Sequence, residues 1–287
     1  FGDGIYEVIP SYSGKMVAFK GHINRMNDGL NAIGIELNWS DAQWLALCNS
    51  LSEKNGAGSL GLYLHVTRGA DTKRFHAYQE NVTPTVFAMT FEIPVPKTPD
   101  LATVGKGYAL TSTEDLRWQR CQIKSTALLG NVLHFQQGFE AGSQETLLFN
   151  SNNELTEASA SNIFIVKDGV IATPIQDNQI LPGITRRLVI DILAKDGTLS
   201  LDERVITLEE VKNADEIWIT SASKEIVPVT KLDGVPVGNG KVGQDVSHLI
   251  PKLRLPKNKD VVIRGEFIIK KDTFNTKYAD KFANPRN

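Results

Sequence analysis

The chain has 287 residues, of which 41% are hydrophobic and 22% charged, so it is long enough for two globular domains. The formal net charge of -2 argues against nucleic acid as a partner, because phosphate backbones require a concentrated basic field. Two cysteines are too few for a disulfide framework, and the sequence shows neither a signal-peptide pattern nor an apolar run that would span a membrane. We therefore expect a cytoplasmic protein that acts on small molecules.

The first 95 residues combine strand and helix patterns typical of a small α+β domain. The predicted elements are a hairpin with arms 5–9 and 16–19, a helix over 22–34, a capped helix after Ser40, and strands over 59–69 and 83–95. The Pro-rich stretch 94–100 is typical of a hinge, so we place an interdomain linker at 96–102.

Residues 103–250 predict a larger α+β domain with an antiparallel, barrel-like sheet. The predicted elements are a strand over 105–112, a helix over 126–142, strands within 145–174, a helix over 184–197, and further strands within 211–237. A cleft between the two domains is the expected ligand site. Residues 251–287 are rich in lysine and arginine, which indicates a basic, solvated tail.

Lys124 is the first candidate for chemistry. It stands between Ile123 and Ser125, ahead of an apolar helical run, where a buried ammonium is unfavourable unless it is paired, neutral or bonded covalently. Burial, with Arg117 and Arg120 nearby, would favour the neutral amine that attacks an aldehyde. The alternative is an ordinary lysine that reaches the surface from the end of a strand.

Three small-residue turns follow, each able to approach a flat or anionic ligand. Glu157 lies in ELTEASASNIF, where a carboxylate can hold a ring nitrogen protonated or merely cap a turn. Gly183, Ile184 and Thr185 open a helix after a Pro-Gly turn, which favours an anion such as phosphate, although such helix starts are common. The loop TSASKE, at 220–225, offers further backbone donors.

Cationic side chains in the first domain extend the set. Arg25 lies on an amphipathic helix, as a surface charge or as a phosphate clamp. Arg74 and His76 stand two apart in a loop between strands, so both can project toward a small carboxylate or remain solvated.

In order along the chain, these motifs resemble the fold-type IV pyridoxal-phosphate aminotransferases, and most closely the D-amino acid transaminases. The matching motifs are FGDGIYEV, GHINR, VTRG, RCQIKSTALLGNVL, LTEASASNIF, LPGITRRLV and TSASKEIVPV, within residues 1–245. Branched-chain aminotransferases and aminodeoxychorismate lyase are related families. The resemblance implies a two-domain fold, pyridoxal 5'-phosphate as cofactor, and a homodimer.

The resemblance also assigns roles. Lys124 would form a Schiff base with the cofactor and shuttle a proton as general base and acid, while Glu157 would hold the ring nitrogen. Residues Arg25, Gly183, Ile184, Thr185, Ser221 and Ala222 would surround the cofactor phosphate. Tyr6 would stand beside the cofactor and the substrate, and Arg74 with His76 would bind the substrate carboxylate.

The sequence departs from the family pattern in two places. In Thr220-Ser221-Ala222 an alanine replaces an expected hydroxyl residue, so Ser221, Ser223 or backbone amides must bind the phosphate. The family carries a first strand ahead of FGDG, whereas this chain begins at Phe1, and Val261–Asp272 has the pattern of that strand. This segment either completes the sheet of the first domain in a rearranged chain or is an unrelated extension.

The expected reaction is transfer of the amino group of a D-amino acid, such as D-alanine, to 2-oxoglutarate or pyruvate. The match of Arg74 and His76 is the reason for preferring D-amino acids. A branched-chain L-amino acid aminotransferase, an aminodeoxychorismate lyase and a binding protein without cofactor are the alternatives.

Overall fold

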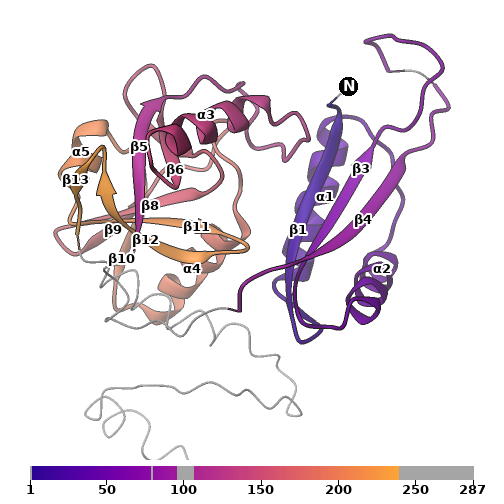
Figure 1. The fold of residues 1–287 in the computed structure, drawn as a ribbon, viewed down its shortest axis with the longest axis horizontal. Coiled ribbons are helices and arrows are strands. Elements are labelled where there is room, and N and C mark those ends of the chain that lie inside the picture. Colours follow the sequence, from indigo (N-terminus) through magenta and orange to yellow (C-terminus); the bar gives the residue numbers. More distant parts are fainter. Residues whose placement is uncertain (1, 79, 96–106, 239–287) are drawn as a thin grey trace, which may run out of the picture. The chain divides into compact units, whose positions relative to one another are not determined.

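The computed structural model describes residues 2–78, 80–95 and 107–238 (Figure 1). Its first part is a four-stranded antiparallel sheet with the order β2-β1-β3-β4 and two helices. The elements are β1 (Gly4–Tyr12), β2 (Lys15–Met16), α1 (Phe19–Ala32), α2 (Asp41–Lys54), β3 (Ser59–Thr67) and β4 (Thr85–Glu92).

Alternation along β1 gives this small sheet two different faces. Ile5, Glu7 and Ile9 are fully buried on the face covered by α1 and α2, whereas Tyr6 and Val8 point the other way and line a cavity. The core beneath the helices includes Ile23, Met26, Trp44, Leu62 and Leu64. The small sheet thus packs its helices on one side and presents β1 to a ligand on the other.

The second part is a nine-stranded mixed sheet, with the order β10-β9-β8-β11-β12-β5-β6-β7 and β13 paired to β12. The strands are β5 (Tyr108–Glu114), β6 (Glu145–Phe149), β7 (Leu155–Ala158), β8 (Asn162–Lys167), β9 (Val170–Thr173), β10 (Ser200–Glu203), β11 (Glu216–Ser221), β12 (Glu225–Leu232) and β13 (Val235–Pro236). The helices are α3 (Leu129–Glu140), α4 (Ile184–Asp196) and α5 (Leu208–Lys212).

Central strands of this sheet are buried on both faces, which explains their nearly continuous apolar sequences. In β8, Ile163 and Ile165 enter one core, while Phe164 enters a second core together with Trp218 of β11 and Val189 of α4. The Phe164 and Trp218 rings stack with centroids 5.6 Å apart. Packing on both faces therefore fixes the positions of the residues at the ends of these strands.

The α+β prediction is confirmed, with differences of detail. The pairs β12–β5, β5–β6 and β9–β10 are parallel, so the larger sheet is mixed and not purely antiparallel. The second hairpin arm ends at Met16, and α1 begins at Phe19, because Ala18 takes a left-handed conformation (φ 49) that separates strand from helix. The predicted cap of α2 is confirmed as a reciprocal pair between Ser40 and Gln43.

Several predicted features lie outside the described residues. These are the linker at 96–102, the tail at 251–287 and the strand-like segment Val261–Asp272. Within the described ranges, every helix is too short or too polar to cross a lipid bilayer.

Candidate active site

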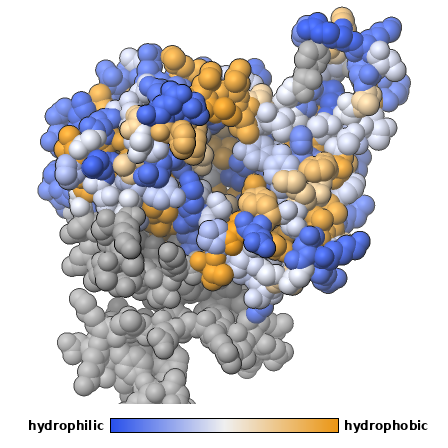
Figure 2. All heavy atoms as spheres, in the orientation of Figure 1, coloured by the Kyte–Doolittle hydropathy of each residue, from blue (hydrophilic) through white to orange (hydrophobic). Residues whose placement is uncertain are grey.

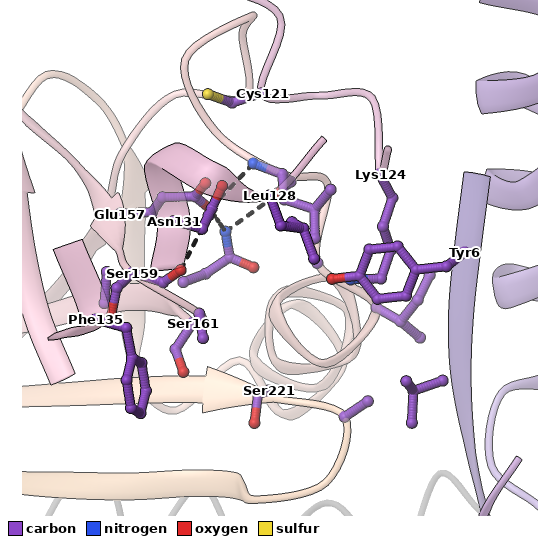
Figure 3. A pocket seen from close by; sticks show the side chains of 18 of the residues that line it. Tyr6, Cys121, Lys124, Leu128, Asn131, Phe135, Glu157, Ser159, Ser161 and Ser221 are labelled. Atoms are coloured by element: carbon purple, nitrogen blue, oxygen red, sulfur yellow. Dashed lines mark hydrogen bonds between the residues drawn. The ribbon is translucent and has the colours of Figure 1, made fainter. Parts of the chain in front are cut away.

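A cavity of about 430 Å³ lies beside β1, a volume that suits a small-molecule ligand (Figure 3). Nine of the residues that the sequence predicts for the site line it: Tyr6, Arg25, Lys124, Glu157, Gly183, Ile184, Thr185, Ser221 and Ala222. Arg74 and His76 are absent from the described lining and lie exposed in the loop between β3 and β4. Motifs spread over most of the described chain therefore meet at one place.

Lys124 belongs to an extended segment that pairs with the start of β1. The Tyr6 amide donates to the Lys124 carbonyl (3.1 Å), and the Thr126 amide donates to the Gly4 carbonyl (2.9 Å). The Lys124 Nζ lies 4.0 Å from the centroid of the Tyr6 ring, within cation–π range. The side chain is half-buried, and Figure 3 shows it with Tyr6 on one side of the cavity. A fixed backbone thus presents a primary amine to the cavity.

Glu157, on β7, lies on the other side of the same cavity (Figure 3). Its carboxylate accepts bonds from Arg117 Nη1 (2.5 Å), Asn162 Nδ2 (3.0 Å) and the Leu181 amide (3.0 Å). Burial raises the pKa of Glu157 to about 7, while the charge of Arg117 and the bonds from Arg117 and Leu181 act in the opposite direction. The carboxyl is therefore poised to ionise near neutral pH.

The placement of the two arginines near Lys124 differs from the prediction. Arg117 is buried and bonds to Asp115 and Glu157, and Arg120 is exposed. Neither has a contact with Lys124 among the interactions of the described residues. The charge of Arg117 thus acts on Glu157, the acid of the site.

The turn before α4 offers backbone donors to an anion. Gly183 caps the helix without a side-chain bond, and the amides of the first helical turn, at Ile184 and Thr185, have no intrahelical acceptor. A Cβ at position 183 would overlap Asn162 Oδ1, so any other residue here would displace the Asn162 side chain from its present position. The hydroxyls of Thr220 and Ser221, which also line the cavity, are buried and lack a partner among the described residues. Unpaired donors from these two segments fit a phosphate group.

Arg25 has a more complex role than a phosphate clamp. Its Nε and Nη2 donate to Glu7 (2.7 and 2.8 Å), and its Nη1 donates to the Pro182 carbonyl (2.8 Å). Burial by itself would raise the pKa of Glu7, but Arg25, with a smaller contribution from His22, lowers it to about 2. Because burial lowers the pKa of His22, the imidazole is neutral and donates from Nδ1 to Glu7 (2.7 Å). Arg25 therefore joins α1 to the turn before α4.

Two buried carboxylates, Glu7 and Glu145, were not predicted from the sequence. Glu145 is fully buried and accepts bonds from Lys224 Nζ (2.7 Å) and Ser161 Oγ (2.7 Å), which ties the 221–224 loop to β6. For Glu7 a signal was available, because it shares the inward phase of β1 with Ile5 and Ile9. A charge at a core position requires a buried partner, which here is Arg25.

Comparison with known proteins agrees with this geometry. The family model described as amino-transferase class IV matches residues 4–232. The chain is 38% identical over 243 residues to a D-alanine aminotransferase of Bacillus licheniformis, covering 85% of this chain and 83% of that protein. It is 37% identical over 249 residues to a D-alanine aminotransferase of Listeria innocua, covering 87% and 85%.

Solved structures show the same fold at lower identity. A branched-chain amino acid aminotransferase of Escherichia coli superposes with a TM-score of 0.79 at 23% identity, covering 91% of this chain and 88% of that one. A putative 4-amino-4-deoxychorismate lyase of Legionella pneumophila superposes with a TM-score of 0.78 at 24% identity, covering 88% and 91%. A branched-chain aminotransferase of T.th., complexed with N-(5'-phosphopyridoxyl)-L-glutamate, gives a TM-score of 0.79 at 23% identity, covering 90% and 87%. The family model and the two relatives at 37–38% identity show that the chain belongs to the class IV aminotransferase family.

Proposed function

We propose that this chain is a pyridoxal-phosphate-dependent transaminase that moves the amino group of a D-amino acid, such as D-alanine, to 2-oxoglutarate or pyruvate. The observation that carries this proposal is one cavity in which the amine of Lys124 and the carboxyl of Glu157 face each other across a space of about 430 Å³. The identity of 37–38% to proteins named D-alanine aminotransferase supports the choice of substrate.

The polar groups that line the cavity suit the phosphate and the ring nitrogen of pyridoxal phosphate. The amides of Ile184 and Thr185 and the unpaired hydroxyl of Ser221 would hold the phosphate, and Glu157 would hold the ring nitrogen. Arg25 uses three N–H groups for Glu7 and Pro182, which leaves two of the five that a guanidinium carries for the phosphate. When bound, pyridoxal phosphate supplies an aldehyde that amines attack and a ring that stabilises a carbanion.

Lys124 and Tyr6 perform the work on the substrate side. The Lys124 amine would hold the cofactor by condensing with its aldehyde, with loss of water, and the freed, neutral amine would accept a proton from the substrate Cα and later return one. The Tyr6 ring, 4.0 Å from Nζ, limits where that amine can swing. Both residues are attached to the same hydrogen-bonded pair of segments, so their spacing is fixed by the backbone.

Arg74 and His76 remain our proposed ligands for the substrate carboxylate. Because they lie outside the cavity in a single chain, the proposal requires their loop to approach a cavity, either its own or that of a second copy. Mixing Lys124→Ala subunits with subunits that carry Arg74→Ala and His76→Ala shows whether the loop acts on its own cavity or on that of a second copy. Activity regained by mixing two inactive proteins places the pair in the partner subunit's site, and absence of regain places it in its own.

We also propose a homodimer, supported by the outer face of α3. Leu129, Val132, Leu133 and Phe139 are 56–70% exposed on this helix, with Val132 also lining the cavity, and Figure 2 shows hydrophobic atoms gathered over it. These positions recur at helical spacing, so they form one apolar stripe. A stripe of four large side chains is unusual for a surface in contact with water, and a second copy of the chain would cover it.

The test is a product assay. D-alanine with 2-oxoglutarate should give pyruvate and D-glutamate, and the Lys124→Ala variant should give neither, nor lose visible absorbance on borohydride treatment. Arg120→Ala, a change at an exposed arginine, serves as the control and should react like the wild type. Turnover of L-leucine in place of D-alanine would reassign the chain to branched-chain substrates, and release of 4-aminobenzoate from 4-amino-4-deoxychorismate would reassign it to the lyases.

A further inference from the structure

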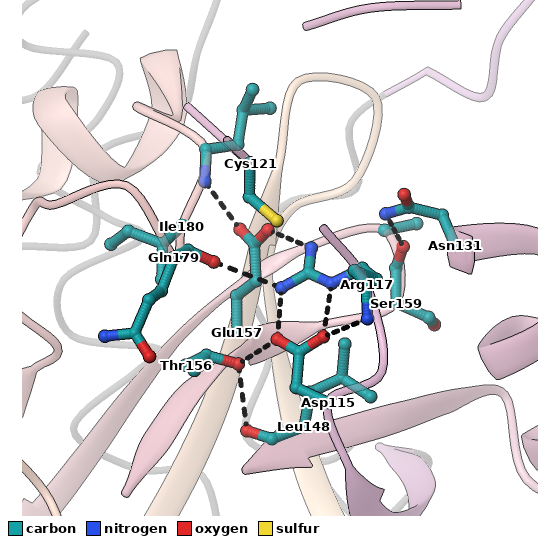
Figure 4. Close-up of polar contacts among 12 residues, drawn as sticks. Asp115, Arg117, Cys121, Asn131, Leu148, Thr156, Glu157, Ser159, Gln179 and Ile180 are labelled. Atoms are coloured by element: carbon teal, nitrogen blue, oxygen red, sulfur yellow. Dashed lines mark hydrogen bonds and ion pairs between the residues drawn. The ribbon is translucent and has the colours of Figure 1, made fainter. Parts of the chain in front are cut away.

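Arg117 lies between two carboxylates at the wall of the cavity (Figure 4). Its Nη1 donates to Glu157 Oε1 (2.5 Å), and its Nε and Nη2 donate to the two oxygens of Asp115 (2.9 and 2.7 Å). Nη2 also donates to the Gln179 carbonyl (3.2 Å). The three charged side chains are 3–8% exposed, so water screens them little.

The hydrogen bonds are distributed unequally between the two acids. A carboxylate offers about four acceptor sites. Asp115 accepts four bonds, from the Arg117 amide, Arg117 Nε and Nη2, and Thr156 Oγ1. Glu157 accepts three, from Arg117, Asn162 and Leu181. The network therefore has one acceptor site left, on the acid that lines the cavity.

The charges of Asp115, Arg117 and Glu157 also indicate that Glu157 can accept a bond from a cationic group in the cavity. Burial opposes the charge of both residues, yet Arg117 lowers the pKa of Asp115, and the two acids raise the pKa of Arg117. Cys121 is a further titratable group beside Glu157, and burial raises its pKa to about 12, so it stays neutral. The Lys124 amine lines the same cavity. With Asp115 and Arg117 both ionised and balancing each other, ionised Glu157 gives the cluster one negative charge, which a cationic N–H in the cavity would neutralise.

We propose that Arg117 is a positioning residue that, anchored by Asp115, keeps Glu157 ionised and directed into the cavity as the acceptor for a cationic ring N–H of the ligand. The inference rests on the proposed function for the identity of that N–H. The bidentate contact with Asp115 fixes the plane of the guanidinium, and the Nη1 bond then fixes one oxygen of Glu157.

The consequence for Glu157 has a definite sign. Its pKa is about 7 with Arg117 present. Removing the positive charge leaves burial unopposed, so the carboxyl ionises only at higher pH and is a neutral acid at neutral pH. The negative charge of Asp115 raises the pKa of Glu157. Removing that charge should therefore lower the pKa of Glu157. Two neighbouring substitutions are thus expected to shift one titration in opposite directions.

The experiment titrates Glu157 by infrared difference spectroscopy in protein purified without cofactor. The carboxyl band of Glu157 is identified by its loss in Glu157→Gln. In Arg117→Met the midpoint should rise by at least one pH unit, a tenfold change in the ionisation constant, and in Asp115→Asn it should fall. Arg117→Lys should lie between Met and the wild type, and Arg120→Met, at an exposed arginine, should leave the midpoint unchanged.

Turnover provides a second readout. The acid limb of the kcat profile should move upward in Arg117→Met, in the same direction as the titration, so activity lost at pH 7 returns in part at alkaline pH. Glu157→Gln should show no such recovery. A Glu157 midpoint that is unchanged or lowered in folded Arg117→Met overturns the inference. If that variant does not fold, Arg117→Lys replaces it, and a midpoint no higher than that of the wild type overturns the inference instead.

The two proposals fail separately. Opposite shifts of the Glu157 titration without turnover of D-alanine would retain the role of Arg117 and refute the proposed reaction. If D-alanine is turned over but the Glu157 midpoint is the same in Arg117→Met and Asp115→Asn as in the wild type, the proposed reaction is retained and the role of Arg117 is refuted.

Discussion

Replacing Glu7 with Gln should destabilise the small sheet by about 3 kcal/mol at pH 7. Glu7 is fully buried and bonded to Arg25 and His22, which lower its pKa from 4.5 to about 2 despite burial. A shift of that size corresponds to about 3 kcal/mol, since one pKa unit is 1.36 kcal/mol. Glutamine keeps the shape but leaves the Arg25 guanidinium buried without a counter-charge, and breaking a buried pair costs about 3–5 kcal/mol.

The effect should depend on pH in one direction. Because the folded-state pKa of Glu7 is depressed, its contribution is complete above about pH 4.5, the unfolded value, and disappears as pH falls to about 2. The difference between wild type and variant should therefore shrink in acid. Urea unfolding followed by circular dichroism at several pH values measures it, and Glu53→Gln, the same change at an exposed position of α2, is the matched control. A difference that is independent of pH, or no larger than that of Glu53→Gln, would refute the reasoning.

Four further experiments, three with substitutions and one with a thiol reagent, test the site and its surroundings. Gly183→Ala should weaken pyridoxal phosphate binding at least tenfold in a fluorescence titration, because the new Cβ overlaps Asn162. Ser221→Ala should weaken the same binding severalfold without lowering the unfolding midpoint, since its hydroxyl has no partner among the described residues. Iodoacetamide at pH 8 should label Cys121 roughly a thousandfold more slowly in the folded protein than in urea, as mass spectrometry can follow, because burial raises the pKa of this thiol to about 12. Leu133→Asp should convert the proposed dimer to monomer in analytical ultracentrifugation, since Leu133 is 61% exposed on α3.

Local patterns predicted those parts of the fold that depend on near neighbours. The cap between Ser40 and Gln43 and the start of α4 at Ile184 follow from residues within one helical turn. The start of α3 was predicted three residues early because Thr126 pairs with Gly4, more than a hundred positions away. The parallel pairing of β5 with β12 likewise joins strands that are far apart in the sequence. No local pattern encodes such partners.

The same distinction applies to the site. Motif resemblance identified nine of the residues that line the cavity, because each motif is a short local sequence, but it also gave Arg74 and His76, which are absent from the described lining. The ion pairs that hold those residues join positions 18 and 40 apart, from Glu7 to Arg25 and from Arg117 to Glu157. Arg117 was therefore placed near Lys124 on sequence proximity, whereas the fold turns it toward Glu157. Short sequence motifs therefore identify the site residues, whereas the charge state of each residue depends on partners that are distant in the sequence.

The buried charges explain how the cavity keeps its form. Arg25 and Arg117 each pair with a buried carboxylate and each also donate to a carbonyl of the 179–183 turn, at Pro182 and Gln179. The turn that would bind an anion is therefore held from two sides by cations whose own positions are fixed by ion pairs. Groups ordered in advance lose less entropy when a ligand binds, and donors that are already oriented need no reorganisation during reaction. Burying these pairs is unfavourable for a structure that only has to fold, but it is useful for one that must hold an anion and a ring nitrogen at fixed positions.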